Sequence, residues 1–213
     1  MKALRLKKNT VKVSKGFTLI ELLTSVAIFS AITTVALFNN SKFNSSVLLT
    51  NTAYEVALAI RQAQFYGVNI KQSSNTTHTL RYQSGYGVRF VPNAGSFFLF
   101  EDVSPDPDNE ALPDRVYTNS DVQVENFTLR RGATISKVCV DSCDSSNTLS
   151  TGEPLDITFL RPNPDAEIRR NGSGVPYSSA RVCVKAPDGT QRKIIVNTTG
   201  QISVVSGDAT DCN

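Results

Sequence analysis

A single carboxylate inside a long apolar segment constrains this chain more than any other feature of its sequence. Residues 17–38 form an apolar run of 22 residues in which Glu21 is the only ionisable side chain. About 20 apolar residues suffice to cross a bilayer, and a charged side chain inside one costs roughly 2.5–3.5 kcal/mol or more unless it has a partner. The run therefore predicts a transmembrane helix over residues 17–38, with a specific role for Glu21.

The residues before the span predict its orientation. Residues 1–16 contain six basic side chains and no acidic one, so the positive-inside rule places this end in the cytoplasm and the residues after Phe38 outside it. A secretory signal has an apolar region of about 7–15 residues and a small-residue cleavage site. This run is longer, and no such site follows at Leu37-Phe38-Asn39. We expect a single-pass protein of the cytoplasmic (inner) membrane.

The junction between these two segments reads Lys15-Gly16-Phe17-Thr18-Leu19-Ile20-Glu21. It resembles the class III signal of type IV pilins and type II secretion pseudopilins, in its glycine at the junction, the aromatic residue after it and the glutamate at the fifth position after the glycine. The resemblance implies that residues 1–16 are a leader. It also implies that prepilin peptidase cuts between Gly16 and Phe17 and methylates the new amino terminus of Phe17.

The physical role expected for Glu21 is charge pairing between subunits. A carboxylate that meets the cationic amine of Phe17 in an adjacent subunit removes the cost of burying either charge alone. Assembly would then relieve a penalty that the isolated subunit carries. The alternative is that Glu21 pairs with its own amino terminus or lies near the lipid headgroups, and the two pairings can occur before and after assembly.

The helix is expected to continue beyond the membrane. Residues 17–66 contain neither Gly nor Pro, which favours one uninterrupted helix of about 75 Å. Beyond the span, over residues 39–71, apolar side chains recur at helical spacing and predict that this exported half packs against a globular domain. The large apolar residues are Phe43, Val47, Tyr54, Leu58 and Phe65, and a flank of smaller ones consists of Ala53, Val56, Ala57, Ile60 and Ala63.

Residues 72–213 are expected to form that domain, because the apolar pattern there changes to the two-residue period of strands. Turn signals such as Pro187-Asp188-Gly189 separate short segments rich in β-branched or aromatic residues. The sequence predicts an α+β fold, with the long N-terminal helix packed on a meander of antiparallel strands. The predicted strands are residues 77–83, 86–91, 96–100, 122–129, 134–140, 155–160, 181–185, 193–197 and 201–205.

Two segments of the exported part resemble, more narrowly, minor pilins and pseudopilins of the GspH/FimT type. Leu58-Ala59-Ile60-Arg61-Gln62-Ala63-Gln64 is similar to their helix end, and Ile194-Ile195-Val196-Asn197-Thr198-Thr199-Gly200 to their closing hairpin. The resemblance implies a structural subunit that helps to start or cap a type IV pilus or a type II secretion pseudopilus, in the periplasm or outside the cell. It implies as partners prepilin peptidase, other pilins or pseudopilins, the inner-membrane assembly platform and membrane lipids.

A binding module at the filament tip, for DNA uptake or adhesion, is the competing function. Some relatives implicated in DNA uptake carry arginines directly after the closing glycine, whereas this chain continues Gly200-Gln201-Ile202-Ser203. Removing the six leader cations from the 22 basic residues leaves 16 against 19 acidic ones, a net charge of −3. Nucleic acid is therefore not the expected partner, since phosphate binding needs clustered cations. The candidate DNA contacts are the basic doublets Arg130 and Arg131, Arg169 and Arg170, and Arg192 and Lys193.

Four cysteines all follow the span, and an oxidising compartment favours their pairing. Three connectivities are open. We favour Cys139 with Cys143, which closes a turn, and Cys183 with Cys212, which holds the tail to the penultimate hairpin. Zinc binding by the four thiols is disfavoured because the spacing lacks two Cys-x-x-Cys pairs.

Catalysis, cofactor binding and metal binding are not expected. His78 is the only histidine and lies in a strand-like pattern, which leaves a Ser-His-Asp triad or a histidine metal site without support. The acidic segment Asp106-Pro107-Asp108-Asn109-Glu110 lacks the glycine and distant glutamate of an EF-hand, so a solvated loop is the default interpretation. Asn171-Gly172-Ser173-Gly174 lacks the following helix that a phosphate-binding loop requires.

Overall fold

The computed structural model describes residues 16–69, 84–103, 105–106, 109–170, 175–205 and 212, without side-chain detail for 38–44 and 104–111. Contacts divide the chain into two compact units, Met1–Phe43 and Asn44–Asn213. The domain boundaries expected from the sequence, after residues 16, 38 and 71, stay predictions, and the last of them lies outside the described residues. Each unit is considered by itself below.

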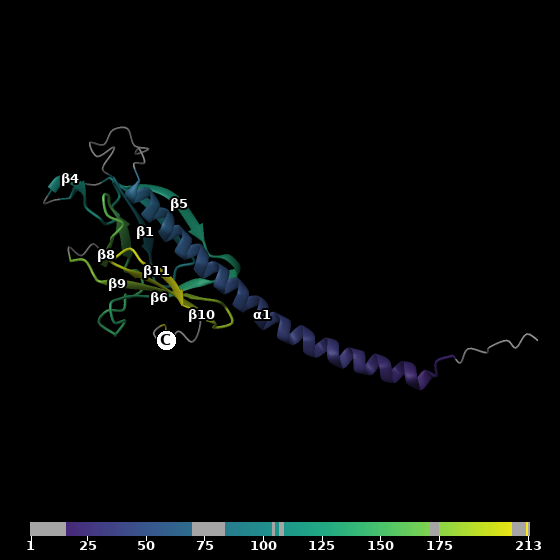
Figure 1. Ribbon diagram of the computed structural model, residues 1–213. Coiled ribbons are helices and arrows are strands. Elements are labelled where there is room, and N and C mark those ends of the chain that lie inside the picture. Colours follow the sequence, from purple (N-terminus) through teal and green to yellow (C-terminus); the bar gives the residue numbers. More distant parts are fainter. Residues whose placement is uncertain are drawn as a thin grey trace, which may run out of the picture. The chain divides into compact units, whose positions relative to one another are not determined.

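A single helix, α1, runs over Leu19–Val68 (Figure 1), in agreement with the uninterrupted helix predicted over residues 17–66. Thr18 precedes it as a cap, and its Oγ1 accepts the backbone N–H of Glu21 at 3.3 Å. Within the first unit, residues Leu19–Leu37 are long and apolar enough to cross a membrane, with a mean hydropathy of 1.9 and no buried residue. The transmembrane prediction is thus compatible with the structure of this segment.

The second unit contains two larger antiparallel sheets. The five-stranded sheet has the order β5-β2-β1-β7-β8, and the four-stranded sheet has the order β11-β10-β9-β6. The first comprises β1 (Gly85–Phe90), β2 (Ser96–Asp102), β5 (Val122–Thr128), β7 (Leu155–Phe159) and β8 (Ala166–Arg170). The second comprises β6 (Thr134–Val140), β9 (Ser179–Lys185), β10 (Gln191–Asn197) and β11 (Ile202–Val205). A small ladder pairs β3 (Pro105–Asp106) with β4 (Asn109–Pro113), and a 3-10 turn, η1, covers Arg130–Gly132.

The α+β class is confirmed, but the expected meander is wrong. Eight of the nine predicted strands are present, with ends that differ by a few residues, and segment 77–83 lies outside the described residues. Strands distant in sequence pair with each other: Val88 of β1 lies opposite Ile157 of β7, and Val138 of β6 opposite Val182 of β9. Two sheets form because the inward faces of these strands bury one another as well as the helix.

Strands β3, β4 and β8 were not predicted. In β8 the inward residues are Ala166 and Ile168, whereas Glu167, Arg169 and Arg170 give the segment a charged composition that obscures the alternation. Burial of alternate residues against the core is what makes β8 a strand. Only two apolar residues mark this short strand, so it is hard to detect from the sequence alone.

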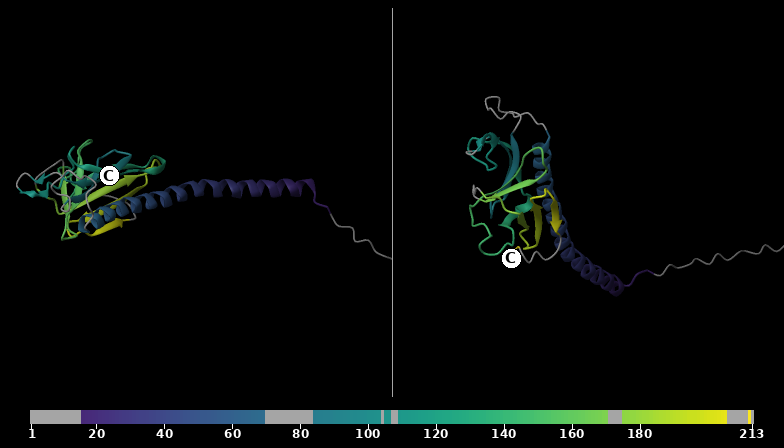
Figure 2. Two further views of the ribbon diagram at one scale, coloured as in Figure 1. Left: turned by 90° about the horizontal axis from the view of Figure 1, so that it is seen from above. Right: turned by 60° about the vertical axis from the view of Figure 1, so that its left-hand side comes forward.

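Only one of the two apolar sets predicted on the exported half of α1 packs on the sheets. The small flank is buried, while the large apolar residues are exposed. In Figures 1 and 2 the part of α1 in the second unit lies along one side of both sheets, which small side chains permit because they let the backbones approach. The buried helix residues are Leu49, Thr52, Ala53, Val56, Ala57, Ala59, Ile60 and Ala63.

The end of α1 is held to the β10–β11 turn by one side chain. Gln64 Nε2 donates to the carbonyl oxygens of Pro164 at 2.9 Å and Gly200 at 3.0 Å. Gly200 has a φ of +76°, and a Cβ atom there would overlap the Pro164 carbonyl oxygen and crowd Gln64. Only glycine therefore allows the turn to approach the helix so closely.

This contact generates a prediction about stability. Gly200→Ala is expected to lower the free energy of unfolding by about 3 kcal/mol, because it combines an unfavourable positive φ with overlap of backbone atoms. Gly189→Ala is the matched control, since Gly189 has a φ of +91° but no atom within 4 Å of an added Cβ. The control should lose only about 1–2 kcal/mol. Urea unfolding of the full chain in detergent measures both, and equal losses would contradict the close approach.

Candidate functional site

The cleavage motif lies at the exposed start of α1. Gly16 and Phe17 precede the helix, and Glu21 lies in its first turn, where a carboxylate is favoured by the helix dipole. Thr18 and Glu21 have the spacing of a capping box. In the described part of the chain the structure records no hydrogen bond or ion pair for the Glu21 carboxylate. Its pairing with the Phe17 amine stays a prediction.

A row of exposed side chains follows α1 through the second unit. Val47, Tyr54, Leu58 and Phe65 are 44%, 57%, 67% and 64% exposed. Together with the exposed Asn51 and Arg61, they recur at alternating steps of four and three residues, the spacing of a coiled-coil seam. We call these six residues the outer seam. The sequence had placed Phe43 in the same set, but the structure does not describe its side chain.

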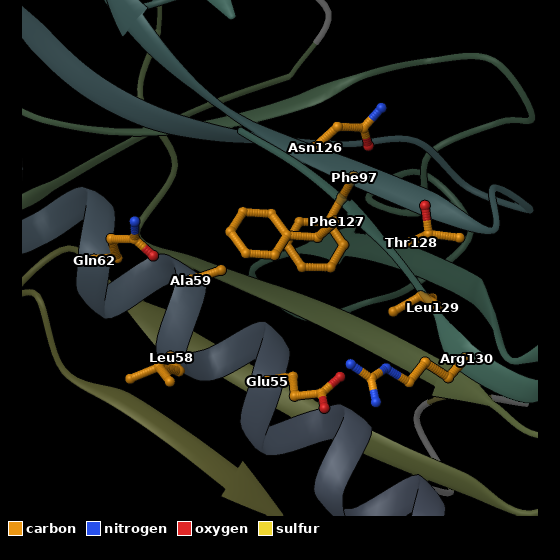
Figure 3. Close-up of a pocket in the computed structure, with 10 residues that line it drawn as sticks. All are labelled: Glu55, Leu58, Ala59, Gln62, Phe97, Asn126, Phe127, Thr128, Leu129 and Arg130. Carbon is orange, nitrogen blue, oxygen red and sulfur yellow. The ribbon is translucent and has the colours of Figure 1, made fainter. Parts of the chain in front are cut away.

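Two hollows are lined in part by residues of the outer seam. One, of about 350 Å³, lies between α1 and the edge strand β5, where Phe97 and Phe127 stack with their ring centres 5.0 Å apart (Figure 3). Glu55 and Arg130 point toward each other at its rim. The other, of about 730 Å³, is lined by Phe65, Tyr66 and Val68 among other residues of the helix end. Leu58 lines both hollows, so the outer seam has depressions next to it that could receive side chains of another helix.

The basic doublets do not form one surface. Arg130 and Arg131 follow β5, whereas Arg169 and Arg170 belong to β8, and these strands are the opposite edges of the five-stranded sheet. Four strand spacings separate these edges by roughly 19 Å. The convergence that a DNA patch would require is therefore absent between these two doublets.

Several of these cations have structural partners. Arg170 donates to Glu153 Oε2 at 2.9 Å and to the Ser146 carbonyl at 2.8 Å. Arg169 lies 3.7 Å from Glu167. The guanidinium of Arg192 reaches α1, where it donates to Ser46 Oγ at 3.0 Å and Thr50 Oγ1 at 3.3 Å. Arg192 is thus part of the contact between β10 and α1. The neighbouring Lys193 also interacts with another group of the protein.

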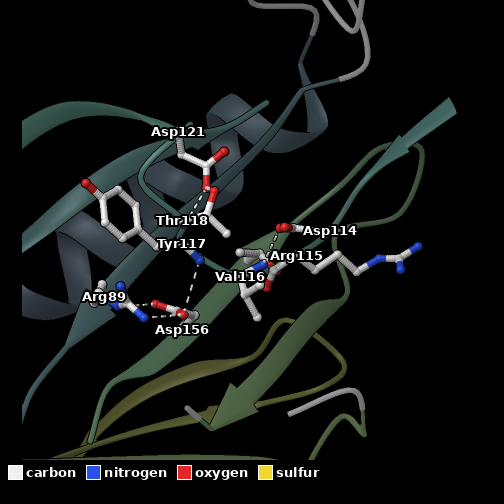
Figure 4. A network of polar contacts seen from close by, with 9 residues as sticks. Arg89, Asp114, Arg115, Val116, Tyr117, Thr118, Asp121 and Asp156 are labelled. Atoms are coloured by element: carbon white, nitrogen blue, oxygen red, sulfur yellow. Dashed lines mark hydrogen bonds and ion pairs between the residues drawn. The ribbon is translucent and has the colours of Figure 1, made fainter. Parts of the chain in front are cut away.

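Buried aspartates surround an irregular segment between β4 and β5 (Figure 4). Four successive backbone N–H groups, of residues 115–118, donate to the carboxylates of Asp102, Asp114, Asp156 and Asp121 in turn, at 2.6–3.2 Å. The segment pairs with no strand in the described part of the chain, so these carboxylates replace the missing ladder. Backbone groups in such a location need acceptors.

Burial changes the acidity of two of these groups. Burial raises the pKa of Asp102 well above its usual value, and the nearby Asp121 and Asp114 carboxylates raise it further. Burial also raises the pKa of Asp156, to about 6, although the Arg89 guanidinium at 2.9 Å and the Tyr117 N–H oppose the rise. Arg89 stacks on the Tyr117 ring as well, at 4.9 Å from its centre.

This aspartate group was not predicted from the sequence. The sequence carries two signals of this group. Asp102 ends an apolar strand, and Thr118 and Asp121 form a turn. The acidic segment that it did select, at residues 106–110, has no described side chains, and His78 lies outside the described residues.

The two favoured disulfide bridges, Cys139–Cys143 and Cys183–Cys212, are both present. The first closes the turn after β6, and the second attaches the C-terminal segment to β9. All four cysteine sulfur atoms are therefore engaged in disulfides.

Comparison with known proteins supports the cleavage motif at the start of α1. Residues 11–37 match the family model described as the prokaryotic N-terminal methylation motif. No curated protein and no solved structure gave a significant match. The motif is that of type IV pilin-like proteins, which prepilin peptidase processes, and with the apolar helix it fits a membrane-anchored pilin or pseudopilin. The match covers residues 11–37 and leaves the second unit unassigned.

The geometry at Gly16 generates a processing prediction. A Cβ atom added to Gly16 would have no neighbour within 4 Å, so Gly16→Val should leave the fold intact. We expect it to block cleavage, because the peptidase must approach the backbone at this junction. Intact-mass spectrometry should find an N-methylated terminus at Phe17 in the parent and an uncleaved chain in the variant. A mature terminus beyond Phe38 in the parent would contradict the pilin assignment.

Proposed function

We propose that this chain is a minor pilin or pseudopilin, a structural subunit without catalytic turnover that assembles through α1 into a type IV pilus or a type II secretion pseudopilus. The leader is cytoplasmic, the span anchors the subunit before assembly, and the second unit is exported. Prepilin peptidase, other pilins, the inner-membrane assembly platform and membrane lipids are its partners. Initiation of the filament or a place at its tip is the proposed position.

The observation that carries this proposal is the outer seam. A soluble domain gains by covering large apolar side chains, yet α1 covers its small ones and leaves Tyr54, Leu58 and Phe65 in solvent. Their 3.5-residue spacing suits a second helix that carries apolar residues at the same interval. We infer that the occupant is the α1 helix of another pilin-like subunit.

One internal contact supports the narrower assignment to the GspH/FimT type. The two segments that carry this resemblance are far apart in sequence, and Gln64 of the first donates to the Gly200 carbonyl of the second. The segments therefore form one structural element of the second unit. This contact supports the GspH/FimT-type assignment, in addition to the sequence similarity that each segment shows by itself.

A structural role is favoured over DNA capture. Two of the basic doublets lie at opposite sheet edges, and Arg169, Arg170 and Arg192 are engaged within the domain. Nonspecific DNA binding gains its affinity from several clustered cations that neutralise phosphates together. Three of the six residues that could supply such a cluster, Arg169, Arg170 and Arg192, are occupied in stabilising the fold.

The first test concerns the outer seam. Leu58→Ser should lower the amount of subunit in sheared filaments several-fold, because it removes an apolar contact with the neighbouring helix. Its effect on folding should be small, within about 0.5 kcal/mol, since Leu58 is 67% exposed. Val175→Ser is the matched control, because Val175 is 70% exposed and belongs to the connection between β8 and β9 and not to α1. Quantitative immunoblots of filament and membrane fractions decide the matter, and equal incorporation of both variants would refute the seam as an interface.

The second test concerns charge pairing in the span. Glu21→Gln keeps the size of the side chain and removes its charge, so membrane insertion and cleavage should persist while incorporation into filaments falls. Thr24→Val serves as a control that changes polarity one turn further along without removing a charge. If Glu21→Gln enters sheared filaments as well as the parent does, the pairing with the Phe17 amine is wrong, although the pilin assignment would survive.

A further inference from the structure

The fold gathers three carboxylates at the base of the connection between β2 and β5. Asp102 is the last residue of β2, Asp114 follows β4, and Asp121 precedes β5. One oxygen atom from each lies within 4.8 Å of the corresponding atom of the other two. Three such groups repel one another when ionised, and the arrangement is created by the tertiary structure alone.

One carboxylate oxygen of these three residues lacks a partner although it is buried. Asp102 is fully buried, and its Oδ2 accepts the Arg115 N–H at 2.7 Å, but its Oδ1 has no hydrogen bond to any described residue. Asp121 differs, because its Oδ1 accepts the Val103 N–H at 2.9 Å and its Oδ2 accepts from Thr118. Buried carboxylate oxygens are almost always paired, so the unpartnered Oδ1 points to a ligand beside Asp102.

The chemistry of the donors selects the ligand. Carboxylate oxygens are the ligands of hard divalent cations. Calcium binds oxygen at about 2.3–2.6 Å, so ligand oxygens on opposite sides of the ion can be about 5 Å apart, whereas magnesium at about 2.0–2.1 Å requires a tighter octahedron. The upper limit of 4.8 Å on these separations lies within the span that calcium can bridge. Asp114 is only half-buried, which leaves the ion a route of entry and room for water ligands.

We propose that Asp102, Asp114 and Asp121 bind one calcium ion, which holds together the end of β2, the residue after β4 and the start of β5. The bound ion would fix the base of the connecting segment, whose backbone N–H groups already depend on these same carboxylates. The site is separate from α1 and does not depend on the proposed assembly function.

The test uses the full chain in detergent, freed of metal with a chelator. Addition of Ca²⁺ to a hundredfold excess over its dissociation constant should raise the thermal midpoint of unfolding by about 5–10 °C. Isothermal titration calorimetry should give one ion per chain, and Mg²⁺ should produce a clearly smaller shift. The absence of a Ca²⁺-dependent shift would overturn the proposal, and an equal response to Mg²⁺ would overturn the calcium preference.

Variants locate the effect. Asp102→Asn keeps an acceptor for the Arg115 N–H and removes one charge, so its midpoint in chelator should be no lower than that of the parent while the Ca²⁺ shift disappears. Asp114→Asn, at the half-buried position, should weaken binding about tenfold or more, because affinity follows the number of charged ligands. Asp165→Asn, at an exposed carboxylate outside the cluster, should keep the full shift. Retention of that shift by Asp102→Asn or Asp114→Asn would show that calcium binds elsewhere and refute this site.

Discussion

The second unit depends on the close packing of one face of α1 against the core that both sheets share. Ala53, Ala59 and Ala63 have no bulky side chain, so the helix backbone approaches the strands, and Val56 and Ile60 fill the remaining space. Large side chains at these positions would hold the helix away from the sheets. The contacts of Gln64 with Pro164 and Gly200 require the same short distance. A single choice of small residues on one helix face therefore determines where the two sheets can lie.

This packing leaves the opposite face of the helix with the large apolar residues. In a helix that had only to stabilise its own domain, the reverse distribution would bury more apolar surface. The arrangement separates two tasks, since small residues hold the domain together and large ones remain available for another helix. The apolar residues of Leu19–Leu37 are exposed as well, which suits contact with lipid. Glu21 is the exception there, because lipid does not solvate a carboxylate.

Charged residues in the second unit act mainly within the fold. Aspartates accept the backbone N–H groups of residues 115–118, and Arg192 attaches β10 to α1. Arg89 and Asp156 form a buried pair beside Tyr117. These side chains supply hydrogen bonds and ion pairs where the backbone is irregular and where β10 meets α1. Strand pairing is missing at these places. In the three-aspartate cluster one hydrogen bond is missing, because Asp102 Oδ1 has no partner among the described residues.

The sequence by itself determined the features that depend on local order along the chain. The Gly16-Phe17 junction, the position of Glu21, the unbroken helix and most strands follow from spacing and from the positions of Gly and Pro, which act over a few residues. The tertiary structure decided which face of α1 is buried, because periodicity shows that apolar residues line a helix without showing whether Ala63 or Phe65 meets the sheets. It also decided the pairing of β1 with β7, the separation of the basic doublets, and the meeting of Asp102, Asp114 and Asp121. Each of these depends on contacts between residues far apart in the chain, and such contacts are selected by the burial of the whole core.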